Sequence, residues 1–199
     1  MHACCAPCSV YCVDSLRKEG IEPTLFWYNP NIHPYQEYKA RRDSLIEYIQ
    51  RENLELVLKD EYGLEEFCKN TIDNLNTRCI DYCYSKRMRK TFEYARDNGY
   101  DTVSTTLLYS IYQKHEFVKH VCEQLSKEFK IDFLYRDFRP GFWEGHDKAK
   151  DIGLYMQKYC GCVFSEYEAA MSKELRKELK EQGINPTDDY IRGLLYKKE

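Results

Sequence analysis

Short apolar runs alternate along the chain with longer segments in which apolar residues recur at helical spacing. Brief runs rich in β-branched and aromatic residues predict strands over Thr24–Tyr28, Leu54–Leu58, Asp101–Thr105 and Asp132–Tyr135. Amphipathic segments predict helices over Ala6–Glu19, Tyr35–Asn53, Ile80–Asn98 and Ile111–Lys130. Because strands that alternate with helices form parallel sheets covered on both faces, the pattern predicts a Rossmann-like three-layer α/β fold.

The C-terminal part of the chain has a different pattern. After Ser165 comes a strongly charged helical segment that Gly183 and Pro186 end, and the last residues predict a loosely held tail. With 199 residues and 43% hydrophobic content, the chain can bury one sizeable core. We therefore expect one α/β domain over residues 1–165, which contains the functional site, and a C-terminal helix and tail of the same domain over residues 166–199.

The overall charge is nearly balanced, with 30 basic and 33 acidic side chains and a formal net charge of −3. This balance does not indicate nucleic-acid binding by the whole surface, and it leaves a local basic patch open. No segment has the pattern of an export signal or a membrane span. We therefore expect a cytoplasmic protein, in which cysteines serve as metal ligands or catalytic thiols rather than as a disulfide framework.

Seven of the ten cysteines fall into three tight clusters, which are Cys4-Cys5-Ala-Pro-Cys8, Cys79-Ile-Asp-Tyr-Cys83 and Cys160-Gly-Cys162. Thiolates from distant segments can share one soft cation or an iron–sulfur cluster. The first cluster opens a predicted helix, whose N-terminus favours thiolates. The third cluster can close a small, strained disulfide of the kind that is redox-active. The three clusters together predict a metal or redox centre at the carboxyl ends of the strands.

The three remaining cysteines have a simpler role, and the clusters also fit two further classes of protein. Cys68 and Cys122 are each isolated within a helical pattern, which favours core packing, and a structural role is also expected for Cys12, one helical turn from Cys8. A zinc-binding RNA or protein interaction module is an alternative for the clusters, although structural zinc usually shows repeated Cys-x2-Cys pairs. A metal-free thiol oxidoreductase that uses Cys160 and Cys162 is a second alternative.

Several blocks of sequence carry a more specific signal, namely CCAPCS, FWYNPNIHPYQEYKAR, RC…CYSKRM, TTLLYSIYQKHE, FLYRDFRPGF and LYMQKYCGCVFSE. In this order, from Ala3 to about Glu166, they resemble the QueH family of epoxyqueuosine reductases. The resemblance implies an adenine-nucleotide hydrolase-like fold. It also implies reduction of the epoxide of epoxyqueuosine in a tRNA anticodon to the alkene of queuosine, the last step of queuosine biosynthesis, without cobalamin. The implied partners are this tRNA and an electron donor protein or reductant, with no membrane.

The resemblance also implies roles for individual residues. A [4Fe–4S] cluster would be held by Cys4, Cys5, Cys79 and Cys83, and Cys160 and Cys162 would form a redox-active disulfide. A further iron ion is expected beside the cluster in some members, and Cys8 and Asp137 are the candidate ligands. The scheme is chemically coherent, because removal of an epoxide oxygen needs two electrons and a Lewis acid.

Two features depart from the family pattern. Only three residues precede Cys4, so the first strand is expected to be shortened or missing. The central pair is Cys-x3-Cys, whereas the usual spacing in the family is Cys-x2-Cys. Either Cys83 fills its role through an altered turn, or Tyr82 marks a one-residue insertion.

Candidate substrate contacts come from a loop and from basic side chains. His33 follows a predicted strand and is a candidate to donate a proton to the departing oxygen, with a turn role as the alternative. Arg87 lies in the basic run 86–90, which together with Arg136 and Arg139 is the candidate phosphate contact, with a solvated helix face as the alternative. For the pair Glu37–Arg41 we expect a solvated helix face. The 18 tyrosines and nine phenylalanines offer stacking surfaces for unpaired bases.

Overall fold

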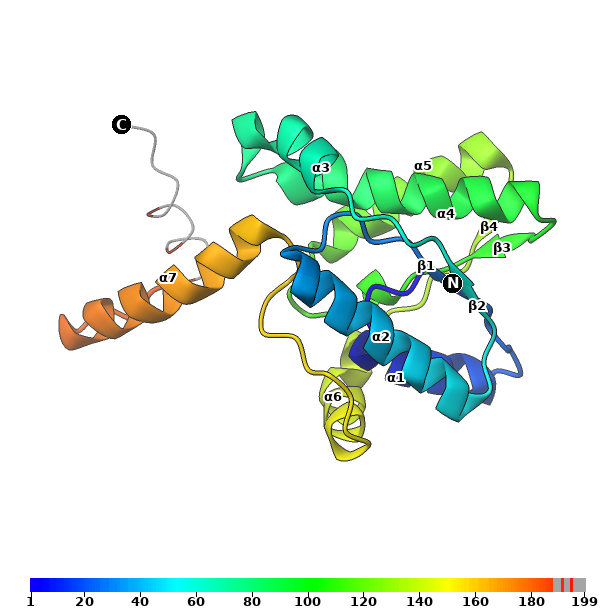
Figure 1. The fold of residues 1–199 in the computed structure, drawn as a ribbon, viewed down its shortest axis with the longest axis horizontal. Coiled ribbons are helices and arrows are strands. Elements are labelled where there is room, and N and C mark those ends of the chain that lie inside the picture. Colours follow the sequence, from blue (N-terminus) through cyan, green and yellow to red (C-terminus); the bar gives the residue numbers. More distant parts are fainter. Residues whose placement is uncertain (188–190, 192–193, 195–199) are drawn as a thin grey trace.

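Short parallel strands lie between helices on both sides. The structure, a computed structural model, describes residues 1–187, 191 and 194. The strands are β1 (Leu25–Trp27), β2 (Leu56–Leu58), β3 (Thr102–Val103) and β4 (Asp132–Phe133). The α-helices are α1 (Ala6–Lys18), α2 (Tyr35–Glu52), α3 (Leu64–Thr71), α4 (Ser85–Asp97), α5 (His115–Phe129), α6 (Phe142–Asp151) and α7 (Val163–Glu181). Helices α4 and α5 lie on one side of the strands, and α1 and α2 lie on the other (Figure 1).

The strands form two small parallel sheets instead of the expected three-layer sheet. β1 pairs with β2, and β3 pairs with β4. The N-terminal segment runs between the two pairs, where His2 forms isolated parallel bridges to Phe26 and Thr105. The amide of His2 donates to the carbonyl oxygen of Ser104 at 2.8 Å, and that of Ala3 donates to the carbonyl oxygen of Phe26 at 2.9 Å. The expected shortening of the first strand is therefore confirmed, because this segment contributes bridges at one residue only.

Helix α1 is packed on two faces. Cys12 and Leu16 lie in one apolar cluster with residues of α4 and α5. Val10 and Val13 lie in a second cluster with residues of β1 and α2. An α-helix whose apolar stripes face two sides in this way is held against translation and rotation. The N-terminus of α1, which carries the first cysteine cluster, is therefore fixed in position by the core.

The four helices predicted from apolar spacing are all present. Gly20 and Gly99 follow α1 and α4 with φ angles of 78° and 76°, the left-handed conformation that glycine adopts readily at a helix end. The helix predicted over Ile80–Asn98 begins instead as a π-helix, Cys79–Tyr84, and continues as α4. The helix predicted over Ile111–Lys130 is shorter, since α5 begins at His115.

Helices α3 and α6 were not predicted from the sequence. Helix α6 packs against α1, and the packing depends on glycine: a Cβ atom on Gly141 would lie 1.9 Å from Cζ of Tyr11, and one on Gly145 would lie 2.7 Å from Cβ of Tyr11. Glycine has low helix propensity, so the two glycines that permit this close contact also make the segment hard to recognise as a helix from its sequence.

Helix α7 extends away from the rest of the molecule (Figure 1). It confirms the predicted charged helix after Ser165, and Gly183, with a φ angle of 79°, follows its end. Most of the predicted C-terminal tail lies outside the described residues. Within the described part of the chain, every helix is too short or too polar to cross a membrane.

Candidate metal and thiol centre

The first cysteine group lies at the N-terminus of α1. The sulfur atoms of Cys4, Cys5 and Cys8 lie within 4.8 Å of one another. Pro7 occupies the first helical turn, where its missing amide hydrogen leaves no hydrogen bond unmade. The amide of Cys4 donates to Oγ1 of Thr106 at 3.0 Å, and the Thr106 hydroxyl donates to Cys4 Sγ at 3.3 Å. This threonine follows β3, so a strand end and a helix end together position the group.

The three thiols of this group share their protons unequally. Hydrogen bonds from Cys5 and Cys8 hold the pKa of Cys4 well below its usual range. Burial, followed by the bond to Cys4, raises the pKa of Cys5, and the bonds to Cys4 and Cys5 raise that of Cys8. The arrangement favours one thiolate with two thiol donors. A soft cation that binds here would displace the remaining protons and gain three thiolate ligands.

The second cysteine group lies in the π-helix. Its hydrogen bonds join residues five apart, so one turn holds an extra residue compared with an α-helix. That geometry accommodates the Cys79-x3-Cys83 spacing and keeps the two side chains hydrogen-bonded to each other. The bond from Cys83, opposed by burial and aided by nearby guanidinium groups, lowers the pKa of Cys79 to about 6. The same bond and burial raise the pKa of Cys83.

The third cysteine group lies on the loop that precedes α7. Cys160 is exposed, whereas Cys162 is only 4% exposed. Arg41 holds the loop by donating to the carbonyl oxygens of Tyr159 and Cys160, both at 2.8 Å. Both cysteines are free thiols here.

The three groups, far apart in sequence, adjoin one another. Gln157, on the same loop, donates from Nε2 to Cys5 Sγ at 3.2 Å. At the other end of the loop, Cys162 packs with Cys83 in a small apolar cluster. Cys79 packs against the core cluster that also contains Cys5 and Cys8. The loop therefore runs from the first cysteine group to the second.

Three buried arginines surround these thiols. Arg41, Arg78 and Arg87 are each no more than 4% exposed. Arg41 pairs with Glu37 at 2.6 Å, and Arg78 pairs with Glu168 at 2.8 Å. Arg87 donates to the carbonyl oxygen of Cys83 at 3.0 Å and has no carboxylate partner among the residues described. Three guanidinium groups are therefore paired with only two carboxylates. A cysteine thiolate can balance the positive charge that remains.

The expectation of a solvated Glu37–Arg41 pair is wrong. The pair forms, but the Arg41 side chain is 3% exposed, because it turns under the loop of Cys160. The short helical spacing of the two residues gave no sign of a loop from the far end of the chain. Arg41 therefore fixes a candidate redox loop that lies more than 100 residues away in sequence.

His33 lies behind this loop. It is 1% exposed, and its ring packs against Tyr62 and Phe67 with centroid distances of 5.5 and 4.7 Å. Neither ring nitrogen makes a hydrogen bond of good geometry, and burial lowers the pKa of the imidazole to about 4. Its backbone amide donates to the carbonyl oxygen of Gly161 at 2.7 Å. In this structure His33 therefore contacts the loop through its backbone.

Asp137 lies apart from Cys8. Its carboxylate accepts hydrogen bonds from Nε and Nη2 of Arg139 at 2.8 and 2.6 Å, and the arginine lowers its pKa. In the described part of the chain, the close metal-ligating group consists of Cys4, Cys5 and Cys8, without a carboxylate. Cys8 thus lies in a group that could hold a metal ion, whereas Asp137 pairs with Arg139.

The basic side chains predicted to contact phosphate are largely paired with carboxylates. The pairs are Lys86–Glu66, Arg89–Glu128, Lys90–Glu93, Arg136–Glu19 and Arg139–Asp137. Arg87, the other arginine of the run, is buried beside the cysteine thiols. The run therefore does not form an open basic patch.

Sequence reasoning missed Arg78, Gln113 and Gln157 as parts of the centre. Arg78 and Gln113 donate to Cys162 Sγ and Cys160 Sγ at 3.4 and 3.3 Å. All three lie within the blocks of sequence that resemble the family, which is the sequence signal that could have found them.

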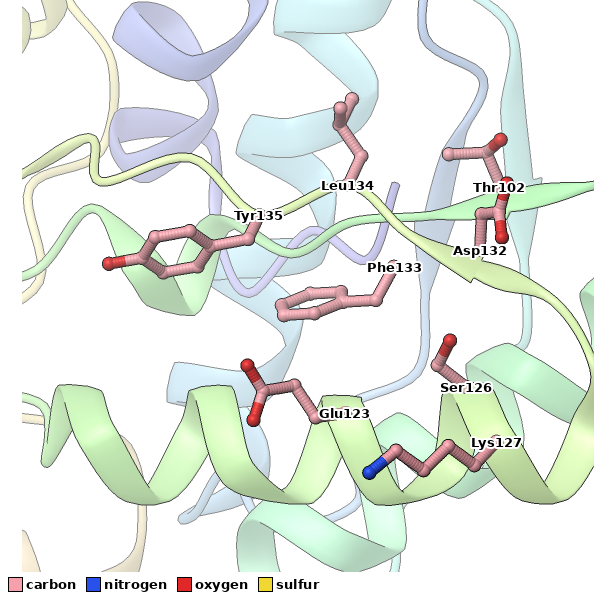
Figure 2. Close-up of a pocket in the computed structure, with 8 residues that line it drawn as sticks. All are labelled: Thr102, Glu123, Ser126, Lys127, Asp132, Phe133, Leu134 and Tyr135. Atoms are coloured by element: carbon pink, nitrogen blue, oxygen red, sulfur yellow. The ribbon is translucent and has the colours of Figure 1, made fainter.

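A groove lies elsewhere, between β4 and α5. It has a volume of about 740 Å³ and is lined by Thr102, Glu123, Ser126, Lys127, Asp132, Phe133, Leu134 and Tyr135. In Figure 2, Glu123 and Ser126 of α5 point toward the segment that carries Phe133, and the Lys127 side chain lies along the helix. The groove contains no cysteine and mixes acidic and basic groups, so it does not extend the thiol centre.

The fold and the thiol centre together define a class, namely α/β proteins with a group of cysteine thiols that could hold a metal ion. The family model described as "Epoxyqueuosine reductase QueH" matches residues 1–168. An epoxyqueuosine reductase QueH from Dehalococcoides mccartyi is 36% identical over 168 residues, which cover 84% of this chain and 92% of the relative. One from Thermotoga maritima is 32% identical over 178 residues, with 84% and 90% covered. The chain belongs to the epoxyqueuosine reductase QueH family and is an oxidoreductase, which confirms the resemblance seen in the sequence.

Proposed function

We propose that the protein reduces the epoxide of epoxyqueuosine in a tRNA anticodon to the alkene of queuosine, with a [4Fe–4S] cluster and a redox-active cysteine pair. Membership of the family supports the reaction. The observation that carries the cysteine chemistry is the close group of Cys4, Cys5 and Cys8, which could hold a metal ion, with Cys79 packed against the same apolar cluster and Cys83 packed with Cys162.

The donor set suits an iron–sulfur cluster. Cys4, Cys5, Cys79 and Cys83 would hold it, and thiolates are the usual ligands of such clusters. A cluster with four thiolates is anionic, and the buried Arg87, without a carboxylate partner in the described residues, supports an anionic group at this place. Cys8 would be available to a further iron, whereas Asp137 would first have to leave Arg139.

The cysteine pair can supply the electrons and protons that the reaction consumes. Reduction of an epoxide to an alkene consumes two electrons and two protons and releases water. Oxidation of Cys160 and Cys162 to a disulfide releases two electrons and two protons. When bound, the cluster would supply one-electron transfer and a Lewis-acidic iron. Arg41 holds the carbonyl oxygen of Cys160 and so keeps the pair beside the centre.

Exposed aromatic rings beside the centre support binding of the anticodon, whose unpaired bases stack on such rings. Tyr112 and Trp143 are 72% and 63% exposed. The ring of Phe142 lies between them, with centroid distances of 5.8 and 5.1 Å. Tyr112 directly precedes Gln113, which contacts Cys160. We use the name stacking surface for Tyr112 and Trp143.

The finer architecture is part of the same proposal. One parallel sheet in the order β2, β1, N-terminal segment, β3, β4 would give the three-layer, adenine-nucleotide hydrolase-like fold. The bridges of His2 to both sheets support this order. Residues 1–165 would form the catalytic domain, and residues 166–199 would extend it as a helix and tail.

Anaerobic purification followed by iron, acid-labile sulfide and zinc analysis tests the cofactor. We expect about four irons with matching sulfide per chain, and turnover of tRNA that contains epoxyqueuosine when a reductant is present. Zinc without sulfide in fresh protein would favour the interaction module. Full turnover in iron-free protein would favour the metal-free thiol oxidoreductase.

Replacement of a single ligand sharpens this test. Cys4→Ala should remove most of the iron and the activity together, because three remaining thiolates hold the cluster poorly. The matched control is Cys122→Ala, which removes a thiol that is fully buried in the core far along the chain on α5. The control should keep its iron. Equal iron content in both variants would contradict the assignment of Cys4.

A further inference from the structure

The two cysteines of the Cys160-Gly-Cys162 loop differ in access. Cys160 is exposed, and its sulfur lies 3.3 Å from the neutral side-chain amide of Gln113. Cys162 is 4% exposed and packs against Cys83. Which sulfur of a disulfide is attacked depends on which one the incoming thiolate can reach. A reductant that arrives from solvent would therefore meet Cys160 first.

The surroundings of Cys162 suit a sulfur that carries negative charge. Cys162 is the N-cap residue of α7, and the amide of Ser165 donates to its Sγ at 3.4 Å. Nε of Arg78 donates to the same sulfur, also at 3.4 Å. A helix N-terminus and a guanidinium group each stabilise an anion, and here they approach one atom from two directions. A backbone amide and a guanidinium group therefore both contact this sulfur.

The guanidinium of Arg78 is held in place from several sides. Its Nη2 pairs with Glu168 at 2.8 Å, and its Nη1 donates to the carbonyl oxygen of Leu75. The group also lies over the ring of Phe164, 5.7 Å from the centroid. Glu168 and Phe164 both belong to α7, the helix that Cys162 caps. Arg78 is therefore fixed relative to the sulfur with little freedom to reorient.

We propose that Cys160 is the sulfur attacked by an external dithiol reductant, that Cys162 is the leaving sulfur, and that Arg78 is the positioning residue that stabilises it. This rests on the redox role proposed above for the pair. A thiolate of the reductant bonds to Cys160 Sγ while the Cys160–Cys162 bond breaks, and the electron pair goes to Cys162 Sγ. The second thiol of the reductant then displaces Cys160 and closes the reductant's own disulfide. Two electrons and two protons pass from the reductant to the cysteine pair.

Mapping of a mixed disulfide tests which sulfur is attacked. The full chain, purified anaerobically with its metal, is oxidised mildly with diamide, treated with less than one equivalent of glutathione, and quenched with N-ethylmaleimide. Peptide mapping should find glutathione on Cys160 and maleimide on Cys162. Glutathione on Cys162 would overturn this assignment alone. Failure of the two cysteines to form a disulfide would overturn the redox role as well, so the two failures are distinguishable.

Reduction kinetics test the role of Arg78. Reduction of the oxidised pair by dithiothreitol should slow about tenfold in Arg78→Gln and about threefold in Arg78→Lys, which keeps the charge but not the geometry. The matched control is Arg89→Gln, on the exposed side of α4, which should reduce at the wild-type rate. If Arg78→Gln does not fold, the reduction rate of Arg78→Lys is compared with that of the control to test the role of Arg78. Wild-type rates in the folded Arg78 variants would overturn the role of this residue.

Discussion

At the scale of single residues, the buried pair of Arg41 and Glu37 makes a contribution to stability that can be measured. Arg41→Ala leaves the Glu37 carboxylate buried without its cation and frees two carbonyl oxygens of the loop. Removing one partner of a buried pair costs about 3 kcal/mol or more. Urea denaturation should show this loss of unfolding free energy.

The control for this variant is Arg51→Ala on the same helix. The side chain of Arg51 is 46% exposed and pairs with Glu47. Its removal should change the unfolding free energy by less than about 0.5 kcal/mol. Similar losses in both variants would show that the burial of Arg41 contributes little.

Burial of His33 predicts a loss of stability in acid. Its pKa is lowered from 6.5 to about 4. Between these values the unfolded chain binds a proton that the folded chain does not, so the unfolding free energy falls as the pH decreases through this window. His33→Gln should remove this dependence, and the wild type should lose up to about 2 kcal/mol more than the variant between pH 7 and pH 4.5.

Urea titrations at several pH values measure this difference. The control is His120→Gln, which removes an exposed histidine on α5. This variant should follow the wild-type curve. Parallel pH curves for His33→Gln and the wild type would contradict a buried neutral imidazole in the native state.

Residue types and spacing were enough to indicate the candidate ligands, but not their neighbours. Cysteine clusters stand out because the residue is rare and chemically distinctive. Arg41 and Arg78 do not, since an arginine on an amphipathic segment usually lies in solvent. Only the tertiary fold brings Arg41 to Cys160, 119 residues away in sequence. Local pattern contains no information on such a contact.

At the scale of elements, the contact between α6 and α1 predicts a sharp response to one methyl group. In Gly141→Ala the added Cβ would overlap the ring of Tyr11. Overpacking of this kind costs about 2 kcal/mol. The melting temperature should therefore fall, as measured by circular dichroism.

A second substitution distinguishes overpacking against Tyr11 from an effect of alanine on the stability of the helix itself. Tyr11→Ala combined with Gly141→Ala should lose less stability than the sum of the two single changes, because the clash is gone. Lys150→Ala, on the exposed face of α6, should leave the melting temperature unchanged within a degree or two. Strictly additive losses at Tyr11 and Gly141 would argue against the close contact.

Elements with a strong apolar period could be predicted, and those defined by tertiary contact could not. Helices α1, α2, α4 and α5 have an apolar stripe of adequate length, and all four lie near their predicted bounds. α6 begins beside Gly141 and contains Gly145, so its propensity is weak until α1 is in place. The strands are two or three residues long, too short for periodicity to define their bounds or to show that they form two sheets.

At the scale of the whole molecule, tRNA binding should depend more on stacking than on net charge. Trp143→Ala and Tyr112→Ala should each weaken binding about tenfold, since stacking of one base contributes about 1–3 kcal/mol. Reversal of Arg89 to Glu should have a small effect, because this cation is already paired with Glu128. Filter binding or fluorescence anisotropy at constant salt measures all three.

The control for the stacking surface is Phe117→Ala. Phe117 is 46% exposed on α5 and lies outside the stacking surface. Its removal should leave affinity for tRNA unchanged. A steep salt dependence together with no effect at Trp143 would place the binding surface elsewhere and would indicate phosphate contacts as its basis.

The π-helix also bears on how such a chain tolerates insertions during evolution. One residue added to a continuous α-helix rotates everything after it by about 100°. Such a rotation would turn the stripe of Met88, Phe92 and Ala95 away from the core that they now fill. A single widened turn takes up the added residue at the cysteines and leaves that stripe in register. Relatives can therefore differ by one residue between these two cysteines while the hydrophobic interior of the protein is inherited unchanged.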